Sequence, residues 1–83
     1  MIIIMSAELS TDYRDGDTIY LLLPGKEARG MLEDWLRAED ADCDLVVHRS
    51  HKNPGCVVVE TRCLRWAYRV LRWYRVKQVK IRS

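Results

Sequence analysis

Four arginines near the C-terminal end are the residues whose type and spacing most clearly suggest chemistry. They follow one another at intervals of three, four and three residues, which places them on one helix face: Arg62, Arg65, Arg69 and Arg72. A guanidinium group stays charged and donates two parallel hydrogen bonds to a carboxylate or a phosphate. Trp66 and Trp73 lie in the same segment and offer flat rings for stacking. The pattern indicates binding of an anionic partner.

A helical projection of residues 62–75 separates an apolar side from a cationic side. At about 100° per residue, the arginines occupy an arc of about 80°, and Trp66 and Trp73 lie next to one another along its border. The side expected to face a sheet carries mainly apolar residues: Cys63, Leu64, Ala67, Val70, Leu71 and Tyr74. We therefore expect both indoles to form a stacked pair on the surface, beside the arginines.

Three interpretations of this surface remain open. In the first, phosphates of a nucleic acid contact the arginines, and bases stack on tryptophan. In the second, the surface docks on an acidic protein, where tryptophan and arginine supply most of the binding energy. In the third, Glu27 and Asp34 of a preceding helix neutralise part of the arginine row, and the tryptophans are partly in the core.

Further cations lie outside this helix and would widen the surface: Arg49, Lys52, Lys80 and Arg82. The first two fall in or beside a basic hairpin loop, and the last two are on the outer side of a predicted strand. The charge of the whole chain is polarised in the same way. Residues 1–47 hold eleven acidic and four basic residues, whereas residues 48–83 hold one acidic and ten basic residues. An anionic partner, or pairing of the two halves, would balance this distribution.

Catalytic and metal-binding patterns are weak. Zinc-ligand types are present without the close pairs that zinc sites show: Cys43, His48, His51 and Cys56. The turn at Pro24-Gly25 lacks the glycine-rich frame of a phosphate-binding loop, and no serine lies in a nucleophile elbow. We expect no catalytic residue, no metal and no cofactor, and therefore a protein that is not an enzyme.

The composition is that of a small globular domain. The chain has 83 residues, of which 48% are hydrophobic and 31% are charged, and this length fits one domain over residues 1–83. No apolar run is long enough to cross a membrane. The three cysteines are odd in number and form no C-x-x-C pair, so we expect reduced thiols and a cytoplasmic location. Cys56 and Cys63 are expected to act as small hydrophobic residues.

The elements that would position these side chains follow from the hydrophobic spacing. We predict strands at 18–23, 44–48, 56–60 and 76–82, and helices at 26–38 and 62–75. This βαββαβ order predicts an α+β two-layer sandwich of the ferredoxin-like type over residues 18–82. Residues 1–17 would add a strand or an extended segment. The Asp15-Gly16 turn favours an alternative, a five-stranded sheet built from two hairpins with two helices.

No motif identifies a family. The RNA-recognition motif needs aromatic residues on its central strands, where this chain offers Tyr20 alone. In its small size, its charge polarity and its lack of catalytic motifs, the chain resembles the small phage-encoded inhibitors that block host defence complexes. This resemblance implies an inhibitor-like binding role.

We therefore predict an inhibitor- or adaptor-like binding module that docks the face formed by residues 62–73 on an acidic protein or a ribonucleoprotein. The first alternative is a sequence-tolerant RNA- or DNA-binding protein. The second alternative is a homodimer joined through the open sheet face, where Tyr20, Leu22 and Val58 would form an apolar patch.

Overall fold

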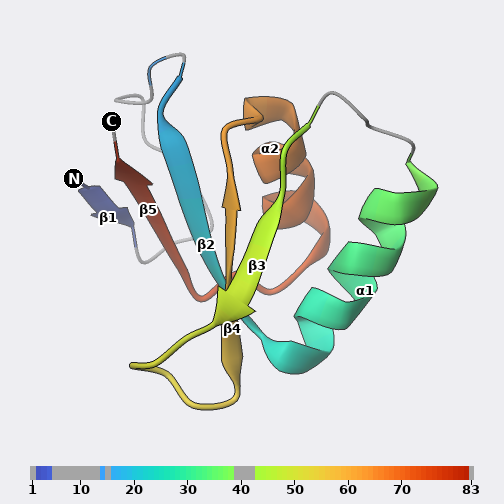
Figure 1. The fold of residues 1–83 in the computed structure, drawn as a ribbon, viewed down its shortest axis with the longest axis vertical. Coiled ribbons are helices and arrows are strands. Elements are labelled where there is room, and N and C mark those ends of the chain that lie inside the picture. The colour runs from blue at the N-terminus through green and yellow to red at the C-terminus, as the bar shows by residue number, and fades with distance from the viewer. Residues whose placement is uncertain (1, 5–13, 15, 39–42, 83) are drawn as a thin grey trace.

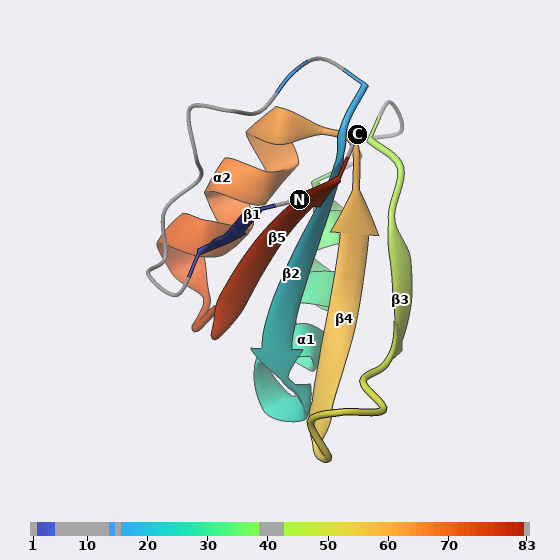
Figure 2. The same cartoon turned by 90° about the vertical axis from the view of Figure 1, so that its left-hand side faces the viewer.

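The computed structural model describes residues 2–4, 14, 16–38 and 43–82. Within these residues the elements are, in order, β1 (Ile2–Ile4), β2 (Thr18–Pro24), α1 (Gly25–Arg37), β3 (Val46–Arg49), β4 (Cys56–Thr61), α2 (Leu64–Trp73) and β5 (Gln78–Arg82). The strands form one antiparallel sheet in the order β1-β5-β2-β4-β3. Both helices lie on the same face of the sheet (Figure 1), and Figure 2 looks onto the opposite, open face. The predicted α+β class, with an antiparallel sheet and two helices, is confirmed.

Helix α2 is shorter at both ends than predicted. At its start, the backbone N–H of Arg62 donates to Asp44 Oδ1 (3.0 Å), and that of Cys63 donates to Thr61 Oγ1 (3.0 Å). These bonds hold the connection from β4 in a non-helical conformation. At its end, Tyr74 is extended (φ −129°, ψ 158°), so the arginine row of the helix itself stops at Arg72.

Strand β2 lies in the middle of the sheet. It pairs with β4 from Ile19 to Pro24 and with β5 from Thr18 to Leu22, so neither side is left for a hairpin through Asp15-Gly16. The alternative of a sheet built from two such hairpins is therefore wrong, because the fifth strand is β1, paired with β5. Tyr13 and Asp15 themselves lie outside the described residues.

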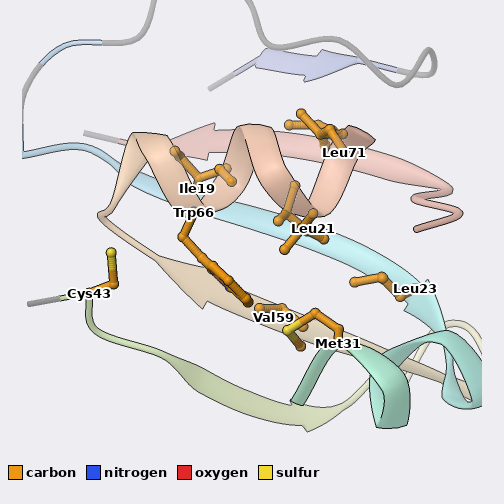
Figure 3. Close-up of a cluster of buried hydrophobic side chains, with 11 residues drawn as sticks. Ile19, Leu21, Leu23, Met31, Cys43, Val59, Trp66 and Leu71 are labelled. Atoms are coloured by element: carbon orange, nitrogen blue, oxygen red, sulfur yellow. The ribbon is translucent and has the colours of Figure 1, made fainter. Parts of the chain in front are cut away.

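The core fills the space between the sheet and the helices. Alternate residues of β2 point toward the helices and are fully buried: Ile19, Leu21 and Leu23. Val59 of β4, Met31 of α1 and Trp66 of α2 meet them there (Figure 3). The other face of the sheet carries the intervening residues of each strand, and this alternation positions the surface described below.

A disulfide joins Cys43, ahead of β3, to Cys63, the N-cap of α2, with their Cα atoms 5.3 Å apart. The prediction of reduced thiols is therefore wrong for these two residues. The reason is the register of the β3–β4 hairpin, in which Val46 lies opposite Glu60. Cys43 precedes Val46 by three residues and Cys63 follows Glu60 by three, so the hairpin brings them together. Cys56 is a free, buried thiol, as expected for a small hydrophobic residue.

Candidate functional site

The two tryptophans of α2 are not a surface pair. Trp66 is fully buried, whereas Trp73 is 69% exposed, so the predicted stacking of the two indoles is wrong. Helix α2 has the sheet beneath it and α1 beside it, and Trp66 extends from α2 toward Met31 and Val59 (Figure 3). Its Nε1 has no hydrogen-bond partner in the described structure, which leaves packing as its contribution. The predicted burial of Ala67, Val70 and Leu71 is confirmed.

The arginine row faces outward, but most of it already contacts the protein's own groups. Arg69 donates to both oxygens of Asp34 on α1, at 3.1 Å from Nε and 2.8 Å from Nη2, and its guanidinium carbon lies 5.5 Å from the centre of the Trp66 ring. Arg62 pairs with Asp44 across 3.5 Å. The pairing predicted between Asp34 and the arginine row is thus observed.

The remaining arginines of the row differ from one another. Arg65 Nη2 lies 3.5 Å from Cys43 Sγ, and this arginine has further contacts. Arg72 lies over Trp73, with its guanidinium carbon 6.0 Å from the ring centre. Glu27, the second acid expected to neutralise the row, forms no ion pair with α2 within the described residues. Trp73 and Arg72 are therefore the part of the predicted site that remains available to a partner.

A cleft of about 510 Å³ separates the two helices where Arg69 meets Asp34; its lining is Asp34, Arg37, Arg69, Trp73 and Tyr74. The Tyr74 hydroxyl donates to the backbone carbonyl of Gly30 (3.2 Å). Burial of the ring, and then the nearby Asp34 carboxylate, raise the pKa of Tyr74 above its ordinary value. The described lining holds two arginines and one carboxylate, and that carboxylate is already paired with Arg69, so the cleft offers an anion one surplus positive charge.

A second hollow, of about 280 Å³, lies on the open face of the sheet. The strands contribute Tyr20, Leu22, His48, Arg49, Val58, Gln78 and Lys80, and the loop from β3 to β4 contributes Ser50, His51, Lys52 and Asn53. We call this hollow the sheet groove. The loop projects from the end of the sheet on the side away from the helices (Figure 1), which is why its basic side chains border the strand residues.

The sheet groove is cationic. Arg49, Lys52 and Lys80 line it. In the part of the chain that the structure describes, no carboxylate lines the groove and none of these three cations forms an ion pair. Arg82 continues the row, because it lies two residues beyond Lys80 on the same face of β5. The four cations predicted as a secondary surface are thus on, or next to, one concave site.

One acid lies beside the groove. Glu60 is the cross-strand neighbour of Tyr20, and its Oε2 is 2.6 Å from Nε2 of His48. This hydrogen bond holds the carboxylate toward β3, and the groove lining does not include it.

The loop that carries Lys52 is held by its own hydrogen bonds. Ser50 Oγ accepts from the backbone N–H of Asn53 (3.1 Å), and Asn53 O accepts from the backbone N–H of Cys56 (3.1 Å). Gly55, with φ +80°, closes the turn in a conformation that side-chain-bearing residues rarely adopt. Gly55 O in turn accepts from the N–H of Gly25 at the start of α1 (2.9 Å). The basic loop is therefore pre-organised rather than dependent on a ligand for its shape.

The open face of the sheet holds a more developed cationic site than the sequence alone indicated. Its signal was present in the alternation of β2 and β5, which places Tyr20 opposite Lys80 once the two strands pair. The sequence does not show that β2 pairs with β5, and this pairing is what brings Tyr20 and Lys80 together.

Two further findings concern the described residues as a group. Within residues 2–4, 14, 16–38 and 43–82, no group of three or more histidines, cysteines and carboxylates could hold a metal ion. In the same part of the chain, neither helix has the length and apolar character needed to cross a membrane. Comparison with protein-family models, with curated proteins and with solved structures found no match to this chain.

Proposed function

We propose that this chain is a non-enzymatic binding module that docks on an anionic partner through the sheet groove. The observation that carries the proposal is the grouping of Arg49, Lys52 and Lys80 around an aromatic and apolar floor, with no carboxylate among the described lining residues. Cations without an internal counterion attract an anionic partner and fix its orientation. Such a module acts by occupying its partner's surface, as an inhibitor or an adaptor does.

The helix face is less suited to this role. Arg62 and Arg69 are paired with Asp44 and Asp34, and a partner would have to displace these carboxylates at a cost. Trp66 is buried and makes no contact with a partner unless the core opens.

The architecture supports the same proposal. The strand order β5-β2-β4-β3, with the two helices on one face, is the arrangement of a ferredoxin-like sandwich, and we interpret the core of the chain as one. A two-layer sandwich of this type leaves one sheet face uncovered. A homodimer joined through that face would bring the lysines and arginines of two copies together, which is unfavourable.

A second candidate has one observation in its favour. Trp73 is 69% exposed beside Arg72, and an exposed tryptophan next to arginine is typical of the centre of a protein–protein interface. This surface would dock on an acidic protein. The cytoplasmic location stays a prediction, and the disulfide does not favour it, because structural disulfides are rare in a reducing cytosol.

Charge reversal tests the proposed function. We expect the double variant Lys52→Glu/Lys80→Glu to elute from immobilised heparin at a much lower salt concentration than the unmodified protein. The matched control is Lys26→Glu/Lys77→Glu, which changes the net charge equally at two exposed lysines that do not line the groove. Equal elution of the two double variants would show that net charge, and not the groove, determines binding. If Trp73→Ala lowered the eluting salt concentration and Lys52→Glu/Lys80→Glu did not, the second candidate would be favoured.

A further inference from the structure

We infer that the occupant of the sheet groove is a single-stranded nucleic acid, with one base stacked on Tyr20 and backbone phosphates on Lys80, Lys52 and Arg49. This inference rests on the proposed function and names the chemical class of the partner. The juxtaposition that carries it is one aromatic ring on the floor of a groove whose rim is cationic.

The position of Tyr20 suits stacking. It lies on β2, the middle strand of the sheet, and is half-buried on the open face, so its neighbours hold it in place while the ring lines the groove. Leu22 and Val58 extend the floor as apolar surface. A nucleobase is a flat group with an unsaturated face, and each base stacked on an aromatic side chain contributes substantially to binding. An acidic peptide offers carboxylates but no such ring in the same repeating unit.

The cations are placed to follow a chain of phosphates. Lys80 is directly opposite Tyr20 in the β2–β5 register, so a phosphate attached to a base on Tyr20 would lie close to its ammonium group. Lys80 and Arg82 are about 7 Å apart along the same face of β5, a spacing that an extended backbone can match with successive phosphates. Arg49, the last residue of β3, and Lys52, in the loop that follows, both line the groove, and the loop is pre-organised by its hydrogen bonds.

A single strand fits better than a duplex. In a duplex the bases are stacked on one another and present only their edges in the grooves, so none can lie flat on a half-buried tyrosine. Among the described lining residues, Tyr20 is the one tyrosine, phenylalanine or tryptophan, which indicates a site for one base. This differs from the two or three bases that the sheet of an RNA-recognition motif stacks.

The test measures binding of a fluorescein-labelled oligothymidylate by fluorescence anisotropy. With about four phosphates neutralised, by Arg49, Lys52, Lys80 and Arg82, a fourfold increase in salt concentration should weaken binding about 50-fold. Tyr20→Val, which keeps a strand-forming residue at this position, should weaken binding at least about fivefold, while Tyr20→Phe, which keeps the ring, should leave it unchanged. Circular dichroism of each variant checks that the fold is intact, and Tyr20→Thr, which also removes the ring and keeps a strand-forming residue, replaces Tyr20→Val if that variant is unstable.

The outcomes separate this inference from the proposed function. If Lys52→Glu/Lys80→Glu abolishes binding but Tyr20→Val binds as tightly as the unmodified protein, the groove holds anions without stacking a base, and only the inference falls. Two further probes are a DNA duplex of the same length and polyglutamate. The inference also falls if the duplex binds as tightly as the single strand, or if polyglutamate binds at the groove and the oligonucleotide does not. If Lys52→Glu/Lys80→Glu binds both the oligonucleotide and polyglutamate as tightly as the unmodified protein does, both the inference and the proposed function are overturned.

Discussion

Trp66 and Trp73 lie seven positions apart on α2, yet one is fully buried and the other is 69% exposed. Trp66→Ala should lower the free energy of unfolding by about 3–5 kcal/mol, because it removes a large buried side chain and leaves a cavity. Trp73→Ala should change it by no more than about 0.5 kcal/mol. Urea denaturation measures both. Similar losses for the two variants would contradict the packing described above.

The different burial of Trp66 and Trp73 shows which information a helical projection does not contain. The projection orders side chains around one axis and so predicts one buried side correctly, as it does for Ala67, Val70 and Leu71. It does not say which side a second neighbour covers. Helix α1 lies beside α2 as well as on the sheet, so the buried side extends to Trp66, and Arg69 packs over its ring.

At the scale of elements, the contact between Arg69 and Asp34 joins the two helices. The guanidinium makes two parallel hydrogen bonds and is partly shielded, with 43% and 21% of the two side chains exposed. A double-mutant cycle with Arg69→Ala and Asp34→Ala should give a coupling energy of about 1 kcal/mol, above that of an exposed pair because of the paired bonds.

The matched control for that cycle is Glu33 and Arg37 on α1. They are four residues apart, both are exposed, and no ion pair joins them in the described structure. We expect their coupling to be about 0.3 kcal/mol. Equal coupling in the two pairs would mean that the contact between the helices adds nothing beyond surface electrostatics.

The elements themselves could be predicted because each is coded locally. The alternation of β2 and the helical spacing of α1 were visible in the sequence, and both elements form within a residue or two of the expected ends. The start of α2 was not visible, because it depends on a contact between the backbone of Arg62 and the side chain of Asp44, which precedes it by 18 residues.

At the scale of the whole molecule, the disulfide closes a loop of about 20 residues that includes β3 and β4. Reduction should lower the free energy of unfolding by about 3 kcal/mol, mainly because the unfolded chain gains freedom. Urea denaturation with and without reductant measures the difference. Alkylation of the unreduced protein in denaturant should modify one thiol, Cys56, whereas modification of all three cysteines would show that the disulfide does not form.

The candidate site was harder to predict than the fold for a related reason. The arginines of α2 are concentrated in one segment, so their clustering is obvious in the sequence. The lining of the sheet groove comes from β2, β3, β4, β5 and a loop, and it becomes a cluster only after the strands pair. The sequence identified the individual cations but not the shared site that they form.

The position of β3 at the end of the strand order has a consequence for self-association. Within the described residues no strand covers its outer backbone, and Val46 of this strand is 53% exposed. An uncovered strand of this kind can pair with its equivalent in a second molecule and begin aggregation. Arg49 at the end of β3, with Lys52 close behind it, opposes such pairing by repulsion between like charges. The cations that would hold a phosphate therefore also keep copies of the molecule apart, and neutralising them without covering β3 would expose the sheet to edge-to-edge growth.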